Sequence, residues 1–193
     1  MEDVSPITRS LRAVRDGDHG AFERLVGLLY DDLRALAAHH LDRNAAHRTL
    51  SPTGLVHEAY LRLASRDQLE WNDRTHFFAA CSVVMRGIVI DFARQRAAKK
   101  RGGGAQPLTL LEADLAIDSQ AEELLALDRA LDRLDSYGER LRRVVECRFF
   151  AGLTEPETAA ALDVSERTVR RDWVKARALL SGLLADGDPG APA

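Results

Sequence analysis

Residues 153–180 read LTEPETAAALDVSERTVRRDWVKARALL, and this stretch is the most specific indication of fold in the chain. Thr154 and Glu157 have the T-x-x-E spacing of a capping box, in which each side chain accepts a hydrogen bond from the backbone N–H of the other residue. Such a box starts a helix, and the apolar residues that follow end near Leu162. We therefore expect a short helix over this part of the segment.

A second helix is expected directly after a tight turn. Asp163 and Val164 form the turn, where glycine is common but where aspartate also tolerates left-handed backbone. Ser165 is a good N-cap, and Val164 and Val169 have the spacing of a hydrophobic staple. The apolar residues of this helix recur on one face, at Val169, Trp173, Ala176 and Leu180. Two helices joined in this way predict a helix-turn-helix.

The outer face of the second predicted helix is polar and basic. A cationic helix that leaves a short turn at a sharp angle is suited to the major groove, where arginine bonds guanine edges or phosphates. The alternative is an ordinary antiparallel helix pair whose exposed face happens to be basic. We favour duplex DNA binding, by Ser165, Arg167, Thr168, Arg170, Arg171 and Lys175.

The rest of the chain also predicts helices, because period-two alternation and hairpin turns are nearly absent. Before the glycines at 102–104, helices are expected from Pro6 to about residue 15 and over 21–41, 52–65 and 73–98. The glycines and Pro107 indicate a linker. The predicted fold is all-α, with two small helical domains joined by a flexible acidic linker: a first domain over 1–101, the linker over 102–120, a helix-turn-helix domain over 121–184 and a disordered tail over 185–193.

The net charge of −3 and the pI of about 6.1 argue at first against a nucleic-acid partner. By segment the charge is uneven. Residues 86–101 carry six basic side chains and one acidic one, and residues 164–177 carry five and two. Residues 102–128 carry six acidic side chains and no Lys or Arg. Two basic helical segments, one in each predicted domain, favour a polyanionic partner over two solvated helix faces.

Composition excludes several other classes. The two cysteines cannot form a disulfide framework and suit a reducing cytoplasm. The N-terminus does not resemble a secretory signal, and no apolar run predicts a membrane span. His57 and Glu58 begin a zinc-protease HExxH pattern, but Leu61 replaces its second histidine. We expect a cytoplasmic protein that is not an enzyme and uses no metal or cofactor.

Three segments together resemble bacterial RNA polymerase sigma factors of the two-domain, extracytoplasmic-function class in the sigma-70 family. Residues 76–103, HFFAACSVVMRGIVIDFARQRAAKKRGG, resemble the end of their second conserved domain. Residues 53–64, TGLVHEAYLRLA, resemble their polymerase-binding helix, and the helix-turn-helix resembles their fourth-region domain. The resemblance implies a transcription initiation factor whose partners are core RNA polymerase and promoter DNA. An anti-sigma factor as a further partner, phosphorylation and the level of expression are alternative means of control, and the sequence leaves them open.

The resemblance also implies roles for particular residues. The N-terminal domain would melt and read the minus-ten element, for which stacking side chains and a cationic track offset the cost of strand separation. Trp71, in the loop over 66–75, could stack on a base or anchor the loop in the core, and both roles remain open. The minus-ten residues would be Trp71, Asn72, Arg74, Arg86, Arg94, Arg96, Lys99 and Lys100. The helix-turn-helix would read the minus-35 element as duplex.

The polymerase-binding residues would lie on the predicted helix over 52–65. Leu55, Ala59 and Leu63 would face the core, and the polymerase-facing residues would be Val56, Glu58, Tyr60 and Arg62. Many sigma factors of this class carry acidic residues just before this helix, whereas this chain has Ser-Pro-Thr-Gly over 51–54. The alternative function is a helix-turn-helix regulator that acts without polymerase, although no ligand-sensing or phosphoacceptor strand is evident.

Overall fold

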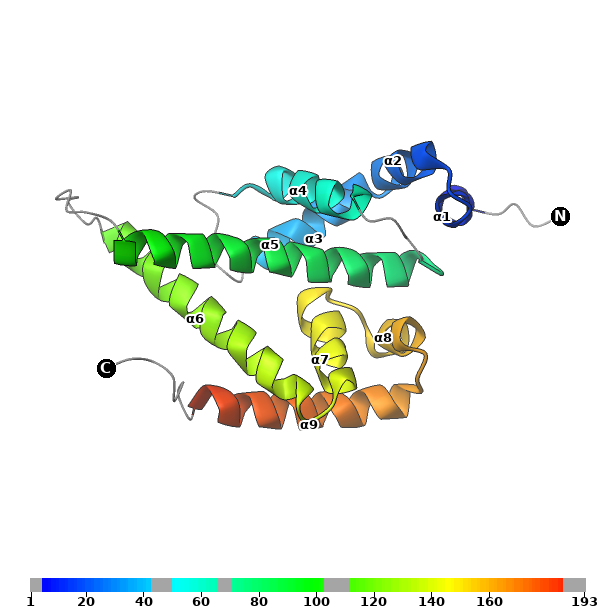
Figure 1. Ribbon diagram of the computed structural model, residues 1–193. Coiled ribbons are helices and arrows are strands. Elements are labelled where there is room, and N and C mark those ends of the chain that lie inside the picture. Colours follow the sequence, from blue (N-terminus) through cyan, green and yellow to red (C-terminus); the bar gives the residue numbers. More distant parts are fainter. Residues whose placement is uncertain (1–4, 43–49, 66–70, 103–111, 186–193) are drawn as a thin grey trace.

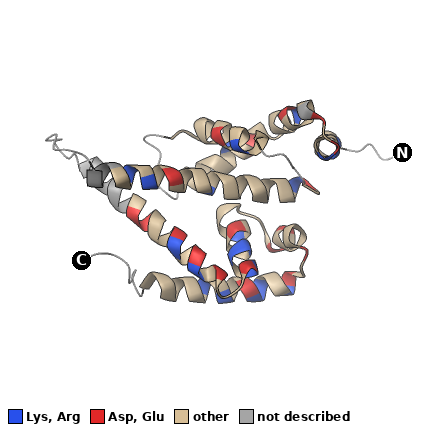
Figure 2. Ribbon diagram, viewed as in Figure 1, with Lys and Arg blue, Asp and Glu red and all other residues tan. Residues whose placement is uncertain are grey.

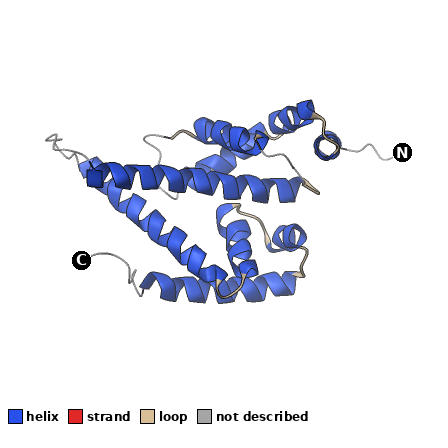
Figure 3. Cartoon of the chain, viewed as in Figure 1, coloured by secondary structure: helices blue, strands red, loops and turns tan. Residues whose placement is uncertain are grey.

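The computed structural model describes residues 5–42, 50–65, 71–102 and 112–185, and over these ranges the fold is helical, without strands (Figure 3). This confirms the all-α prediction. The N-terminal half contains α1 (Pro6–Arg15), α2 (His19–Leu28), α3 (Tyr30–Asp42), α4 (Pro52–Ala64) and α5 (Arg74–Gly102). The C-terminal half contains α6 (Glu112–Asp135), α7 (Glu139–Val145), the π-helical turn η2 (Glu146–Phe150), α8 (Glu155–Leu162) and α9 (Glu166–Ala185).

The N-terminal half packs around α5. Phe77 on α5 is fully buried, as are Leu55 and Leu63 on α4 and Leu25 on α2. Ser51 caps α4 by accepting a hydrogen bond from the Gly54 N–H at 3.0 Å. This core continues onto the C-terminal half, because α6 contributes a buried leucine, Leu124, to the same hydrophobic cluster.

The predicted helix over 21–41 is divided into α2 and α3. The division falls at Leu29, whose backbone (φ −111°, ψ 11°) departs from helical geometry. Leu25, Leu29 and Leu33 nevertheless all remain buried, so the apolar stripe is continuous across the kink. Hydrophobic periodicity therefore predicted the buried face correctly and missed the change of direction, which turns α2 against α1.

The C-terminal half packs α6, α7 and α9 around a second core. Its fully buried members include Leu131 and Leu134 on α6 and Ala176 on α9. Gly138 has φ 135° at the turn that joins α6 to α7, a backbone region that favours glycine. Figure 1 shows α9 along one side of this half, with α7 between it and α5.

Helix α6 begins inside the predicted linker. The linker was expected over 102–120, whereas residues 112–120 are helical. A physical reason is that residues 112–120 contain neither glycine nor proline, so their composition does not interrupt a helix. Residues 103–111 and the predicted tail beyond residue 185 lie outside the described residues, so the flexibility of the linker stays a prediction.

The two halves are in direct contact through α5. One side of α5 packs on α3 and α4, and the other packs on α6, η2 and α8 (Figure 1). By length and composition α5 could cross a membrane, with a mean hydropathy of 1.5 over its most apolar part, but 61% of that window is buried inside the protein. These are the properties of the central core helix of a helical protein.

Candidate nucleic-acid and polymerase interface

Hydrogen bonds fix the start of α8 as the sequence predicted. The Thr154 N–H and hydroxyl both donate to Glu157 Oε2, at 2.8 and 2.7 Å, and the Glu157 N–H points back to Thr154 Oγ1 at 3.4 Å. These bonds hold the pKa of Glu157 below its usual value, because they stabilise the ionised carboxylate. The capping box is therefore present.

The turn between α8 and α9 also has its expected geometry. Asp163 adopts the left-handed conformation (φ 52°, ψ 49°) and ends α8. The Thr168 N–H donates to Ser165 Oγ at 3.2 Å, which caps the start of α9. Val169 is fully buried, and Val164 packs against the same small cluster. The caps and the staple therefore set the angle at which α9 leaves the turn.

The outer face of α9 is basic and accessible. Arg167, Arg170, Arg171 and Lys175 are exposed, and Thr168 is half-buried. Figure 2 shows the corresponding blue bands on the half of α9 that follows the turn. Arg170 pairs with Glu155 of α8 at 3.0 Å. Because this arginine side chain is 65% exposed, the pair is weak and can be exchanged for a phosphate or a base.

Asp172 anchors two of the surrounding arginines. Its side chain is 4% exposed, and it accepts hydrogen bonds from Arg140 at 2.6 Å and from Arg171 at 3.0 Å. Burial by itself would raise the pKa of Asp172, but the two arginine hydrogen bonds outweigh burial and hold the pKa below its usual value. Arg171 therefore keeps a defined position while its guanidinium stays largely exposed.

The minus-ten residues are divided between the core and the surface. Trp71 is 7% exposed, and its ring lies 4.9 Å from Phe77 and 5.7 Å from Phe22. Of its two possible roles, this position favours the core anchor. Asn72 and Arg74 are exposed, and Arg74 pairs with Asp32 at 2.8 Å. The preceding loop residues, 66–70, lie outside the described residues.

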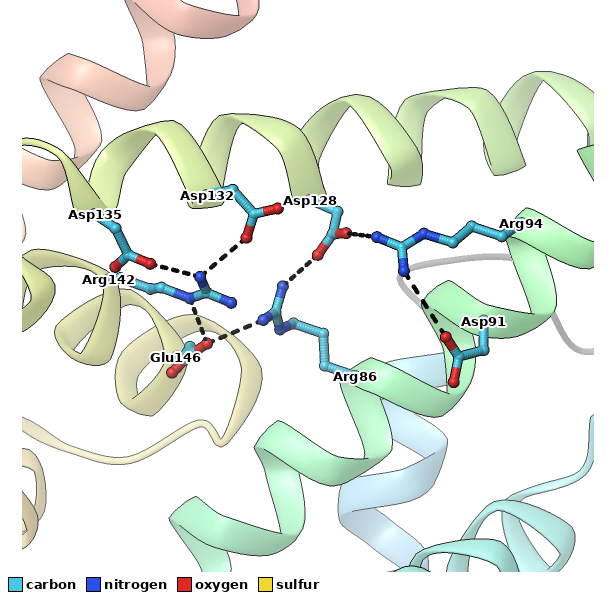
Figure 4. A network of polar contacts seen from close by, with 8 residues as sticks. All are labelled: Arg86, Asp91, Arg94, Asp128, Asp132, Asp135, Arg142 and Glu146. Carbon is cyan, nitrogen blue, oxygen red and sulfur yellow. Dashed lines mark hydrogen bonds and ion pairs between the residues drawn. The ribbon is translucent and has the colours of Figure 1, made fainter.

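Arg86 lies inside the protein, whereas the sequence predicted that it would contact DNA phosphates. It is 6% exposed, and its guanidinium donates to Asp128 of α6 at 2.7 Å and to Glu146 of η2 at 3.1 Å (Figure 4). The reason for the difference is that both carboxylates come from the other half of the chain. In this arrangement Arg86 is not accessible to DNA.

The remaining cations on α5 differ in exposure. Arg94 is 59% exposed and pairs with Asp128 at 2.9 Å (Figure 4). Arg96 is half-buried. The backbone of Lys99 and Lys100 continues α5, but their side chains lie outside the described residues. The structure therefore brings Arg86 and Arg94 together on one carboxylate of α6.

Helix α4 presents a narrower polymerase surface than expected. Val56 was predicted to be exposed, but it is 4% exposed because α4 packs against both α3 and α5 and so buries a wider face. Tyr60 is half-buried, with its ring stacked 5.2 Å from that of Phe22. Glu58 and Arg62 are exposed as predicted.

The sequence interpretation missed one exposed apolar residue on this surface. Leu61 is 48% exposed on α4, beside Arg62, which pairs with Asp91 of α5 at 2.9 Å. The signal in the sequence was its position on the predicted polymerase-binding helix, next to Arg62 and three residues after Glu58, both of which were expected to be exposed.

Both cysteines and two of the histidines are buried or hydrogen-bonded. Burial raises the pKa of both thiols, that of Cys147 to about 12, with nearby Glu146 adding to the effect. His40 is buried and bonded to Ser82 at 3.0 Å, and His39 is bonded to the Phe149 carbonyl at 3.1 Å. No group of three potential metal ligands occurs in the part of the chain that the structure describes.

An all-helical chain whose C-terminal half carries a capped, basic helix after a tight turn has the architecture of a DNA-binding transcription protein. Comparison with protein families agrees with this class. The family model of the ECF sigma factors matches residues 4–186, so the chain belongs to the ECF sigma factor family. Among curated proteins, no relative matches the chain.

Membership of this family identifies a promoter-specific transcription initiation factor. The family consists of transcription factors and is not a family of enzymes. Core RNA polymerase and promoter DNA are the partners that membership implies. Within the described part of the chain, α5 is the one helix long and apolar enough to cross a membrane, and most of its apolar window is buried inside the protein.

Proposed function

We propose that the chain binds core RNA polymerase, reads the minus-35 element as duplex with α9, and melts and reads the minus-ten element with α5 and the loop before it. The observation that carries this proposal is the outer face of α9, where four exposed cations follow a turn fixed by the capping box, by Asp163 and by Ser165. A rigid scaffold is needed because base readout requires each side chain to be placed accurately.

On the minus-35 side, α9 would enter the major groove with its N-terminal end. Ser165 and the backbone around it would contact phosphates, and Arg167, Arg170 and Arg171 would reach base edges or the adjoining phosphates. Lys175 lies farther along the same exposed side and would contact the backbone. The pair between Arg170 and Glu155 is exposed, so its loss costs little when DNA takes the place of the carboxylate.

On the minus-ten side, Asn72 and Arg74 lie exposed at the start of α5, and the cationic segment over 86–101 forms its later part. The aromatic cluster around Trp71 would hold the loop in place while its polar residues face the extruded strand. Basic side chains along one helix and a loop beside it are the parts from which single-strand tracks are built.

The polymerase contact would be made by α4. Its exposed residues combine a carboxylate (Glu58), a guanidinium (Arg62) and an apolar side chain (Leu61). Such a mixed surface fits a partner helix better than it fits DNA, since an acidic residue at its centre would repel phosphates. An anti-sigma factor that covers this surface would prevent assembly, and we propose such a protein as a further partner in the cytoplasm.

The decisive experiment joins assembly and transcription. The purified chain is mixed with core polymerase, passed over gel filtration at moderate salt, and then tested by run-off transcription on a pool of genomic promoter fragments. Co-elution with promoter-selective transcripts is expected. Failure to co-elute would contradict the proposal and would favour a regulator that acts on DNA without polymerase.

A further inference from the structure

The contact between the two halves is built from specific interactions. On the apolar side, Ala79 of α5 packs against a cluster that contains Cys147, Leu153 and Ala161. On the polar side, the Phe149 carbonyl lies 3.1 Å from His39 Nε2. Complementary apolar and polar contacts of this kind indicate a defined closed arrangement of the halves.

Arg86 lies at the centre of this contact. Its guanidinium bridges Asp128 and Glu146, and it also lies 5.6 Å from the centroid of the Phe150 ring. All three partners belong to the C-terminal half, and both carboxylates are nearly as buried as Arg86 itself. A charge buried among apolar side chains is tolerated only when it is paired, so the closed form depends on these carboxylates.

The carboxylates are themselves held in position. Arg94 donates to the second oxygen of Asp128 at 2.9 Å, and Arg142 donates to Glu146 at 3.1 Å (Figure 4). Arg142 also bonds Asp135 at 2.7 Å, which ties η2 to α6 within the C-terminal half. Asp128 and Glu146 are therefore set as a pair of acceptors for the arginines of α5.

The position of these two acceptors is the position that phosphates would take. In the proposed function, which this inference presupposes, Arg86 and Arg94 belong to the cationic segment of α5 that follows the separated strand. In the structure, these guanidinium groups are paired instead with carboxylates of the other half. Carboxylate and phosphate oxygens bind arginine with similar geometry, so one can replace the other.

We propose that Asp128 and Glu146 form an internal latch that closes the C-terminal half over α5 and withholds Arg86 and Arg94 from DNA. When the halves separate, Arg86 and Arg94 lose these carboxylates and become available to DNA, so the latch can act as a switch. The affinity of the free chain for a separated DNA strand is then reduced by the fraction of molecules that are closed.

The test uses the full chain with both carboxylates replaced, Asp128→Asn with Glu146→Gln. These substitutions keep the side-chain shape, and neither residue belongs to the proposed DNA-binding set. The matched control is Asp132→Asn, because Asp132 lies on the same helix but pairs with Arg142 of α7, at 3.0 Å, instead of with an arginine of α5. The single variant Asp128→Asn replaces the double one if circular dichroism shows that the latter is not folded.

The first measurement is small-angle X-ray scattering. A compact chain of this length should have a radius of gyration of about 16 Å. We expect the wild-type chain and the Asp132→Asn control to share this compact radius. We expect the double variant to have a larger radius. An unchanged radius in the folded double and single variants would overturn the latch.

The second measurement is the anisotropy of a labelled mixed-sequence DNA fork with one single-stranded arm, titrated at several salt concentrations. We expect the latch variant to bind about 10-fold more tightly at low salt, as a mostly closed population becomes open. Two arginines released from their carboxylates should also steepen the slope of log K against log salt by about 1.4. An open variant with an unchanged slope would overturn the masking of the two arginines.

The two proposals fail differently. An open variant with a steeper slope that still does not co-elute with core polymerase would refute the proposed function, while the latch would stand. A chain that assembles with polymerase and transcribes, with no change of radius in the latch variants, would refute the latch alone.

Discussion

Replacing Trp71 distinguishes the two roles that its sequence position allowed. The Trp71→Ala variant removes a ring that is 7% exposed and that packs edge-on against Phe77 at 4.9 Å and beside Phe22 at 5.7 Å. Truncation of a buried aromatic side chain costs about 3–5 kcal/mol, because transfer energy is lost and a cavity is left. The aromatic contacts add to that cost.

Urea unfolding followed by circular dichroism measures the effect. With an m-value of about 2–3 kcal/mol/M, the loss corresponds to a midpoint lowered by roughly 1–2.5 M. Asn72→Ala, a change at the exposed neighbouring residue, is the control and should shift the free energy of unfolding by less than about 0.5 kcal/mol. Trp71→Phe should recover most of the stability, since it keeps a ring in the cluster.

A base-stacking role would have a different signature. A tryptophan that only stacks on DNA could be removed with little change in unfolding, while affinity for a forked promoter would fall by about 1–3 kcal/mol. A Trp71→Ala protein that unfolds at the same urea concentration as the wild-type chain would therefore refute the core-anchor assignment.

Three further changes test the helix-turn-helix and the polymerase surface. Arg170→Ala should weaken binding of holoenzyme to promoter duplex by about 1–3 kcal/mol in a gel-shift titration, with Arg9→Ala on α1 as the control; equal affinities would remove Arg170 from the recognition surface. Glu58→Lys should prevent co-elution with core polymerase without changing the circular dichroism spectrum, and normal holoenzyme formation would refute that contact. The lowered pKa of Asp172 means that its stabilisation is present above the unfolded value of about 3.8 and is lost as pH falls through the folded value. In thermal melts at a series of pH values, Asp172→Asn should thus reduce the loss of stability on the acid side. An unchanged dependence on pH would contradict the stabilising role of the ionised Asp172.

The helix-turn-helix could be predicted closely because its determinants are local. The capping box of Thr154 and Glu157, the left-handed Asp163 and the cap at Ser165 each involve residues within a few positions of one another. Such contacts are encoded by spacing alone. The buried face of α9 follows from the same local periodicity, with Val169 fully buried.

Arg86 and Val56 could not be placed in the same way, because distant segments determine their surroundings. Arg86 is paired with residues 42 and 60 positions away. Val56 is buried because two helices, α3 and α5, flank α4, whereas its spacing suggested one core face. Only the burial of Arg86 carried a signal in the sequence: it stands among apolar residues on α5, and a charge there requires a partner.

The positions of the charges in the fold explain more than the net charge of −3, because the basic and acidic segments lie against each other. The basic segment over 86–101 and the acidic segment over 102–128 adjoin in sequence, and α5 and α6, which contain most of their residues, also pack side by side. Arg86 and Arg94 meet on Asp128, so opposite charges neutralise each other within the closed chain. An arginine paired with a carboxylate attracts a phosphate less strongly at long range than a free arginine, because the field of the carboxylate opposes that of the guanidinium. The closed chain should therefore attract a DNA phosphate to α5 less strongly than the charge of the segment over 86–101 suggests.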